Sequence, residues 1–230
     1  MKDSLGDRMK YYERLSEQQL MKNMPVAVRL DGRAFHTFTR GMKKPFDLDM
    51  INAMSNTTEY IINNFQAVKI AYVQSDEITL ILWDGDTIET DAPFSYRKSK
   101  LESILASMAA VQMSIAFNRP CEFDARSWNI PIHEVRNVLL WRHKDWEKNS
   151  VQMYARSEFS HNELHRKSQA DMHEMLHQKG LNWANLDDVY KNGTWFYKLP
   201  EKPFIKDHEK RISEDIQVLV KDCLVSDYIY

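Results

Sequence analysis

The sequence is poor in the residues that are typical of disulfide-rich, zinc-binding and low-complexity proteins. Its 230 residues include two cysteines, six glycines and seven prolines. Cys121 and Cys223 lie far apart with no CxxC spacing, which excludes a disulfide framework and a zinc site and suits a reducing compartment. Because no repeat or low-complexity tract is present either, no flexible linker is evident.

Long apolar runs and an excess of one charge are also missing. The most apolar window, Ile104–Phe117, is shorter than the roughly 20 residues that span a bilayer and contains Ser and Gln. The N-terminus is polar and has no secretory segment, so we expect a soluble, cytoplasmic protein without a membrane partner. A formal net charge of −2 excludes a generally basic nucleic-acid coat but allows a local basic surface.

What is present is an ordinary globular composition with a clear alternation of strands and helices. In chain order we expect a helix over Asp3–Lys22, a strand over Val26–Leu30, a helix over Asp47–Phe65, a hairpin of Ala67–Val73 and Ile78–Trp83, a helix over Arg97–Phe117 and a strand over Glu122–Ala125. The order β-α-β-β-α-β permits a ferredoxin-like α+β sheet. This is the palm shape used by several nucleotide-handling enzymes.

From Ile132 onward the sequence becomes mostly helical. We expect one or two helices over Ile132–Glu158, a helix over Ser168–Gln178, a loop over Asn182–Asn192, a hairpin of Thr194–Tyr197 and Lys202–Ile205, and a helical end around Ser213–Leu219. We therefore divide the chain near Pro131 into a palm domain with an N-terminal helix (1–131) and a mostly helical extension (132–230).

Two strand-like runs of the palm end abruptly in acidic residues. The first run ends in Asp31-Gly32, and Ser75-Asp76-Glu77 forms the tip of the hairpin. If these strands pair, Asp31 and Asp76 meet at one rim of the sheet, where two carboxylates suit a pair of Mg²⁺ ions acting on a phosphate. Gly32 permits close approach of the backbone and offers its carbonyl as a further ligand. Each element alone is more often a structural turn, but together they favour function.

Two basic groups near the palm motifs suit an anion. Arg33-Ala-Phe-His36 is placed to turn its N–H groups toward a triphosphate where a helix begins. Arg97 and Lys100 stand at a helix start, where cations oppose the helix dipole. An anion there and a solvated helix end explain the second pair equally well.

Two further patterns lie in the extension. Trp141 and Trp146 are interleaved with the basic residues Arg136, Arg142, Lys144 and Lys148. This pattern predicts either a basic, aromatic RNA surface or, slightly favoured, a solvated helix face with Trp in the core. Histidines recur at positions 161, 165, 173 and 177, and the surrounding Ser, Gln and Glu favour a wet helical face over a metal stripe.

Four segments together resemble the tRNA(His) guanylyltransferase family, whose members are 3′–5′ nucleotide-adding enzymes with a polymerase-like palm. They are RLDGRAFHTFTR at 29–40, KPFD at 44–47, QSDEI at 74–78 and FDAR at 123–126. The second half is similar to the bacterial-type, tRNA-repair branch of that family. It carries WR at 141–142, NS at 149–150, FSH at 159–161, EL at 163–164, KS at 167–168 and GLNW at 180–183.

The resemblance implies a set of site residues. The metal ligands for two Mg²⁺ would be Asp31, the Gly32 carbonyl and Asp76, with Asp31, Asp76 and Glu77 as the catalytic set and Glu77 in a catalytic or supporting role. The nucleotide-binding residues would be Asp31, Gly32, Arg33, Ala34, Phe35, His36, Asp47, Ser75, Asp76, Arg97 and Lys100. The extension would serve tRNA binding and oligomerisation, with RNA contacts from Arg136, Arg142, Lys144, Lys148, Asn149 and Lys167.

The implied reaction is template-dependent 3′–5′ addition of nucleotides to the 5′ end of tRNA, after activation of that end by ATP, with GTP and other nucleoside triphosphates as substrates. Family analogy also implies a homotetramer. The eukaryotic branch has a His-x-Asn-Asn cluster near Asn149 and a Lys at the position of Met172. This chain has EKNS at 147–150, so the resemblance favours 5′-end repair over strict G addition to tRNA(His). The alternatives are a palm-type nucleotide cyclase, which uses similar carboxylates, and a non-catalytic tRNA-binding module. The presence of Asp31, Asp76 and Glu77 argues against the second alternative.

Overall fold

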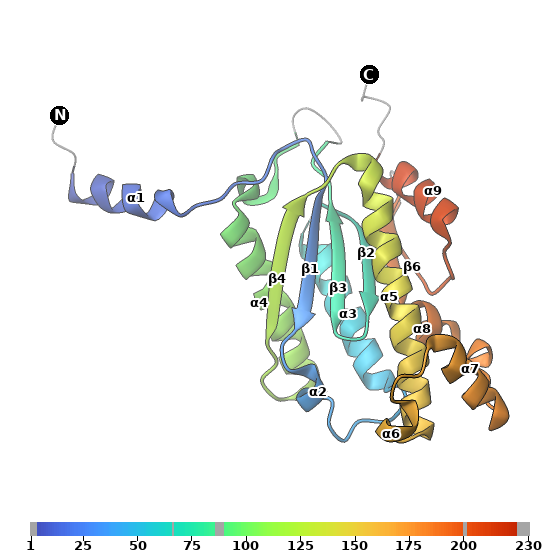
Figure 1. Cartoon of the computed structure of the whole chain (residues 1–230). Helices are drawn as coiled ribbons and strands as arrows, with labels where there is room; N and C mark the ends of the chain where they lie inside the picture. Colours follow the sequence, from blue (N-terminus) through green and yellow to red (C-terminus); the bar gives the residue numbers. More distant parts are fainter. Residues whose placement is uncertain (1–3, 66, 86–89, 200–201, 225–230) are drawn as a thin grey trace.

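A single antiparallel sheet forms the centre of the molecule (Figure 1). The computed structural model describes residues 4–65, 67–85, 90–199 and 202–224. The strands are β1 (Val26–Gly32), β2 (Val68–Gln74), β3 (Glu77–Leu82), β4 (Phe123–Asn129), β5 (Thr194–Lys198) and β6 (Phe204–Asp207). Their order is β4-β1-β3-β2-β5-β6, and the first four strands in the order β4-β1-β3-β2 confirm the predicted ferredoxin-like core.

Helices cover the two faces of the sheet unequally. α3 (Leu48–Asn64) and α4 (Lys98–Phe117) pack on one face, against the β1 side chains of Val28 and Leu30. α5 (Ile132–Glu158) and α9 (Ser213–Leu224) lie on the other face, which carries Ala27. This division follows from the two-residue period of a strand. On the α5 side, the outer residues of β4 stay exposed, so the sheet is open beside α5 (Figure 1).

The sheet continues beyond residue 131. β5 pairs with β2 and β6 pairs with β5, so the predicted C-terminal hairpin extends the palm sheet itself. The second half of α5 forms a separate small cluster with α6 (His161–Leu164) and α7 (Gln169–Gln178). The stretch expected as a loop over Asn182–Asn192 contains two short helices, η2 (Trp183–Asn185) and α8 (Asp188–Asn192). Asn182 accepts a hydrogen bond from the Ala184 amide and so begins the first of them.

Several boundaries differ from the sequence-based expectation. α1 spans Leu5–Leu15 rather than Asp3–Lys22, whose first residue lies outside the described residues. It ends early because the following segment pairs with the start of α4: the Lys98 amide donates to the Gln18 carbonyl at 2.8 Å. η1 (Pro93–Tyr96) precedes α4, and α2 (Phe35–Phe38) follows β1. No described helix combines the length and the apolarity needed to cross a bilayer.

Candidate active site

Asp31 and Asp76 meet at one rim of the sheet. The β1–β3 register places Asp31 opposite Glu77, the residue that follows Asp76. The Gly32 amide donates a hydrogen bond of 3.1 Å to the Asp76 carbonyl, which fixes the end of β1 against the β2–β3 turn. The pairing that the sequence predicted for these two acidic segments is therefore present.

The charges at this rim favour a bound cation. Burial raises the pKa of Asp76, and the negative charges of Asp31 and Glu77 add to the increase. Hard carboxylate and carbonyl oxygens are the donors that Mg²⁺ prefers, so Asp31, Asp76 and the Gly32 carbonyl fit such an ion. Within the described ranges, no group of three or more His, Cys, Asp or Glu side chains converges on one point. A metal here would therefore complete its shell with water or phosphate oxygens, as Mg²⁺ commonly does.

Glycine is required at position 32 by its neighbour Phe35. A Cβ atom at Gly32 would lie 2.2 Å from the Phe35 ring, far inside contact distance. Phe35 is buried against Phe38 and Phe123, with ring centroids 4.8 and 5.3 Å away. The Phe35 side chain thus anchors the segment from Arg33 to His36, whose Arg33 and His36 side chains are exposed.

Two non-glycine residues of the predicted nucleotide segments have left-handed backbone. Ala34 has φ +56° at the start of α2, and Ser75 has φ +48° in the two-residue turn before β3. Few L-residues adopt this region, and such strain clusters at functional sites. The same backbone region recurs at six other described non-glycine residues, so it shapes these two turns and does not by itself identify a functional site.

Glu77 is buried in an ion pair with α5. Its two carboxylate oxygens accept hydrogen bonds of 2.6 Å each, one from Nε and one from Nη2 of Arg142. Arg142 Nη2 also donates to Asp145 at 3.0 Å, and the Thr79 hydroxyl lies 3.2 Å from Glu77 Oε1. Glu77 is thus held in place by α5, and its catalytic or supporting role stays a prediction. Arg142 was expected among RNA contacts, but its buried guanidinium is committed to these carboxylates and is absent from the exposed surface.

The interleaved basic and aromatic pattern of α5 divides into core and surface. Trp146 is 3% exposed and belongs to the core, whereas Trp141 is 51% exposed. Lys144, Lys148 and Asn149 are exposed on α5, as is Lys167 beyond α6. Arg136 is half-buried and donates to the side chain of Gln217 on α9 at 3.0 Å. The solvent-facing ridge of α5 therefore carries Trp141 followed by two lysines.

Arg97 and Lys100 lie at the opposite end of the sheet from the acidic rim. Arg97 bridges to Gln19 and pairs with Glu17 at 3.3 Å, near the start of β1. Lys100 Nζ lies 5.0 Å from the centroid of the Phe94 ring of η1. Five residues of strand separate the start of β1 from Asp31, a distance of about 17 Å. One chain therefore does not bring these two cations to the carboxylates, and their part in holding a triphosphate stays a prediction.

Asp47 begins α3. Its carboxylate accepts hydrogen bonds from the amides of Met50 and Lys43 at 3.1 and 2.9 Å. Burial opposes its ionisation, but these amide hydrogen bonds outweigh that effect and lower the pKa of Asp47. The position is thus explained by helix capping, and a nucleotide contact from Asp47 stays a prediction.

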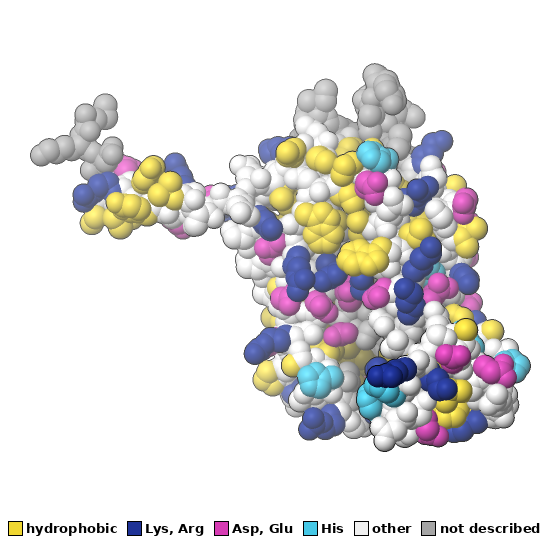
Figure 2. All heavy atoms as spheres, viewed as in Figure 1, with side chains coloured by type: hydrophobic (Ala, Val, Ile, Leu, Met, Phe, Trp, Pro, Cys, Tyr) yellow, Lys and Arg dark blue, Asp and Glu magenta, His cyan; other side chains and the backbone are white. Residues whose placement is uncertain are grey.

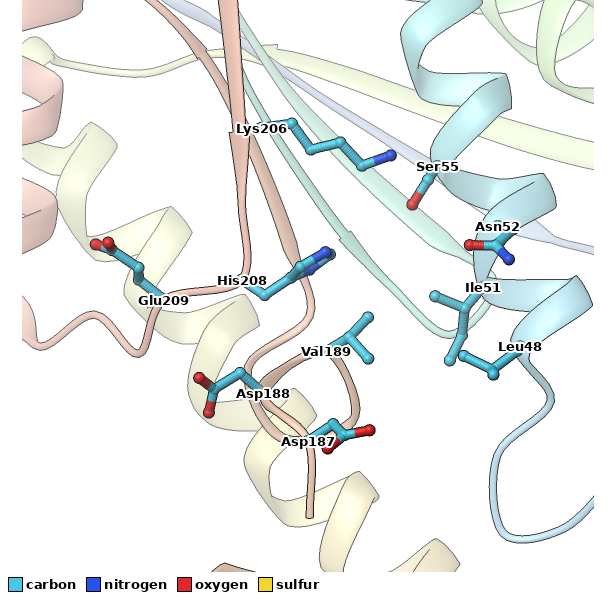
Figure 3. Close-up of a pocket in the computed structure, with 10 residues that line it drawn as sticks. All are labelled: Leu48, Ile51, Asn52, Ser55, Asp187, Asp188, Val189, Lys206, His208 and Glu209. Atoms are coloured by element: carbon cyan, nitrogen blue, oxygen red, sulfur yellow. The ribbon is translucent and has the colours of Figure 1, made fainter. Parts of the chain in front are cut away.

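The histidine stripe and a cavity on another side of the molecule both lie outside this rim. The His161 and His165 rings are 6.3 Å apart and exposed, and His173 packs edge-on against Trp183, as expected for a wet helical face. A cavity of about 410 Å³ lies between the start of α3, α8 and the end of β6 (Figure 3). Lys206 and His208 point into it, while Asp187, Asp188 and Glu209 add negative charge. None of the residues predicted for metal or nucleotide binding is among its described lining residues.

On the open face of the sheet beside α5, apolar, basic and acidic side chains lie in separate rows. Asp31 and Arg29 of β1, together with their partners Asp124 and Arg126 of β4, point to this face by strand alternation. Figure 2 shows this face with apolar side chains above, a row of Lys and Arg across the middle, and a row of Asp and Glu beneath it. The acidic rim is therefore flanked by positive charge and then by aromatic surface.

The fold and the rim define a palm-type α+β protein with paired carboxylates at the end of its central strands. Comparisons with known proteins agree with this class. The family model described as tRNAHis guanylyltransferase matches residues 6–140. The chain belongs to that family, whose members are nucleotidyltransferases that add nucleotides in the 3′–5′ direction to the 5′ end of tRNA.

Three relatives show how far the similarity extends. A solved bacterial tRNA(His) guanylyltransferase-like protein in complex with ATP is 35% identical, with a TM-score of 0.91, over 96% of this chain and 100% of that chain. A second such structure, in complex with GTP, is 34% identical with a TM-score of 0.85, over 97% and 100%. The tRNA(His) guanylyltransferase of Schizosaccharomyces pombe is 27% identical over 87% of this chain and 82% of its own length.

Proposed function

We propose that this protein extends or repairs the 5′ end of tRNA by template-dependent 3′–5′ nucleotide addition, with ATP as activating nucleotide and GTP and other nucleoside triphosphates as substrates. The observation that carries the proposal is the meeting of Asp31 and Asp76 at one rim of the palm sheet, beside Gly32. Relatives solved with ATP and with GTP support the choice of nucleotides.

Each residue of the rim has a distinct part in this proposal. Asp31, Asp76 and the Gly32 carbonyl would hold two Mg²⁺ ions. When bound, such ions lower the pKa of an attacking hydroxyl and neutralise phosphate charge. Glu77 and Arg142 hold the Asp76 turn in position. Asp47, His36 and the backbone of the adjoining segments would bind the nucleotide, and a role for Arg97 and Lys100 requires a phosphate at the other end of the sheet.

The exposed basic residues beyond the palm would contact the RNA backbone. Lys144, Lys148 and Asn149 lie on the solvent side of α5, and Lys167 lies beyond α6. Base pairing with the opposite strand of the acceptor stem would select the nucleotide, so the protein needs few base-specific contacts. Shape and backbone contacts dominate recognition of RNA helices, which suits a chain with a net charge of −2.

The proposal includes a homotetramer, which two unpartnered apolar surfaces support. α1 projects from the body with no buried residue and exposes Leu5, Met9 and Tyr12 (Figure 1). α4 has no charged residue between Glu102 and Arg119 and exposes Val111 and Ile115. Isolated helices as short as α1 are marginal in water, so we expect both surfaces to be covered by other copies of the chain. The two free, buried cysteines suit the cytoplasm.

The test is extension of a tRNA lacking its 5′-terminal nucleotide, with ATP, GTP and Mg²⁺. We expect labelled 5′ extension by the wild type and its loss in Asp76→Ala, with Asp124→Ala as a control carboxylate on the neighbouring strand. Full activity of Asp76→Ala removes the metal assignment. Cyclic nucleotide formed without RNA would instead identify a cyclase, and tRNA binding without any extension a non-catalytic module.

A further inference from the structure

Trp141 stands on the surface of α5 beside the open face of the sheet. Its side chain is 51% exposed, although tryptophan is usually well buried in a globular protein. Leu139, earlier on the same helix, belongs to the buried core that includes Ala27 and Ile81, and Val138 packs against that core. The exposure of Trp141 is therefore a property of its position on the outer side of α5.

Two guanidinium groups support the Trp141 ring. The Cζ atom of Arg142 lies 4.6 Å from the ring centroid, and that of Arg29 lies 5.9 Å from it. Both arginines reach Glu77 as well: Arg142 through its two short hydrogen bonds and Arg29 through an ion pair of 3.9 Å. The ring is thus attached to a buried charge cluster that includes the residue next to Asp76.

This arrangement fixes the ring relative to the carboxylates. Arg29 is two residues before Asp31 on the same face of β1, a separation of about 7 Å along the strand. Arg142 is bound to the residue that follows Asp76. An exposed aromatic ring that is already held in place loses little conformational entropy when a ligand packs against it.

We propose that Trp141 is a stacking platform for a nucleobase brought next to Asp31 and Asp76. The inference rests on the proposed nucleotidyl transfer and adds a base-binding residue to it. Aromatic side chains beside basic residues bind bases without reading their identity, because every base has a π-face. Lys144 and Lys148 lie further along the same exposed ridge of α5. Their positive charges suit the phosphates of a chain whose base stacks on Trp141. The base belongs either to the end of the RNA or to a nucleoside triphosphate.

The experiment compares Trp141→Ala and Trp141→Phe with wild type in equilibrium binding. The ligands are Mg-ATP, Mg-GTP, inorganic tripolyphosphate, a 5′-truncated tRNA, and the same RNA with an abasic 5′-terminal residue. Tyr60→Ala, an exposed aromatic position on α3 behind the sheet, is the control. Removal of the stacking on one base corresponds to about tenfold weaker binding.

We expect Trp141→Ala to weaken binding about tenfold for one class of base-bearing ligand and Trp141→Phe to restore most of it. Loss only for ATP and GTP assigns the nucleotide base, and loss only for the intact RNA assigns the RNA end. Tripolyphosphate and abasic RNA should bind the variants and the wild type alike. Equal losses for these base-free ligands, or no loss for any ligand, would overturn the platform. Binding is measured apart from extension, so an inactive wild type would reject the enzymatic function and leave this result interpretable.

Discussion

Arg142 of α5 donates two hydrogen bonds of 2.6 Å to Glu77 of β3, a residue 65 positions earlier in the sequence. Because Glu77 directly follows Asp76, this contact connects the helix that borders the open face with the turn that carries a proposed metal ligand. Buried ion pairs of this kind contribute little net stability when intact, but they are costly to break.

Removing only one partner of this pair should therefore destabilise the fold strongly. We expect Arg142→Ala to lower the free energy of unfolding by about 3–5 kcal/mol, because the Glu77 charge would stay buried without a partner. The cycle is completed by Glu77→Gln and by the double variant Arg142→Ala with Glu77→Gln, which should regain much of that loss. Urea unfolding of the four proteins of the cycle measures the coupling, and additive effects would contradict it.

The binding of Mg²⁺ should depend on pH through Asp76. Burial and the charges of Asp31 and Glu77 raise the pKa of Asp76, so protonation competes with the cation at a higher pH than for an ordinary Asp. We expect the Mg²⁺-induced increase in Tm to be full above this raised pKa and to disappear as pH falls through it.

In the metal-free protein, folding stability should depend on pH in the opposite direction. The ionised form of Asp76 is disfavoured in the folded state, so stability should fall as pH rises through the raised pKa. Thermal unfolding with and without Mg²⁺, from about pH 4 to about pH 8, checks both trends. Asp76→Asn should remove the Mg²⁺ effect, and Asp124→Asn should keep it.

Gly32→Ala should damage the rim through Phe35. The added Cβ would lie 2.2 Å from the Phe35 ring, so either the ring or the end of β1 must move. We expect a loss of about 1–3 kcal/mol of stability, typical of an overpacked core, together with a loss of extension activity. Phe35→Leu in the same chain should recover stability more than activity. Unchanged unfolding of Gly32→Ala would show that the loop adapts freely.

Charge on the outer ridge of α5 should control RNA affinity. We expect Lys144→Ala with Lys148→Ala to weaken tRNA binding and to reduce the slope of log K against log salt by roughly one for each lysine that pairs with a phosphate. Lys221→Ala, on the exposed side of α9, is the matched control and should leave that slope unchanged. Filter binding across a salt series measures the slope.

The apolar face of α4 should control assembly. Val111→Asp with Ile115→Asp places charges where we expect another copy to pack, so the protein should elute as a smaller species in size-exclusion chromatography with light scattering. Val218→Asp, at an equally exposed position on α9, should not alter the mass. An unchanged mass for the α4 variant would exclude this face as an interface.

The sequence by itself determined the core of the fold and the acidic rim. Apolar periodicity and the two acidic strand ends, at Asp31 and Asp76, predict the order of elements and their convergence, because apolar strands that alternate with helices leave few other arrangements. The short helices within Asn182–Asn192 were missed because capping by residues such as Asn182 stabilises helices too short to show a period.

Only the tertiary structure decided which of the charged and aromatic residues are available for function. Sequence spacing treats Arg142 and Lys144 alike, and Trp141 and Trp146 alike, yet one of each pair is buried and the other exposed. It also groups Arg97 with the acidic motifs, although the length of β1 separates them. The reason is physical: burial and distance depend on contacts between segments far apart in the chain, such as Glu77 with Arg142, and local sequence does not encode which partner arrives.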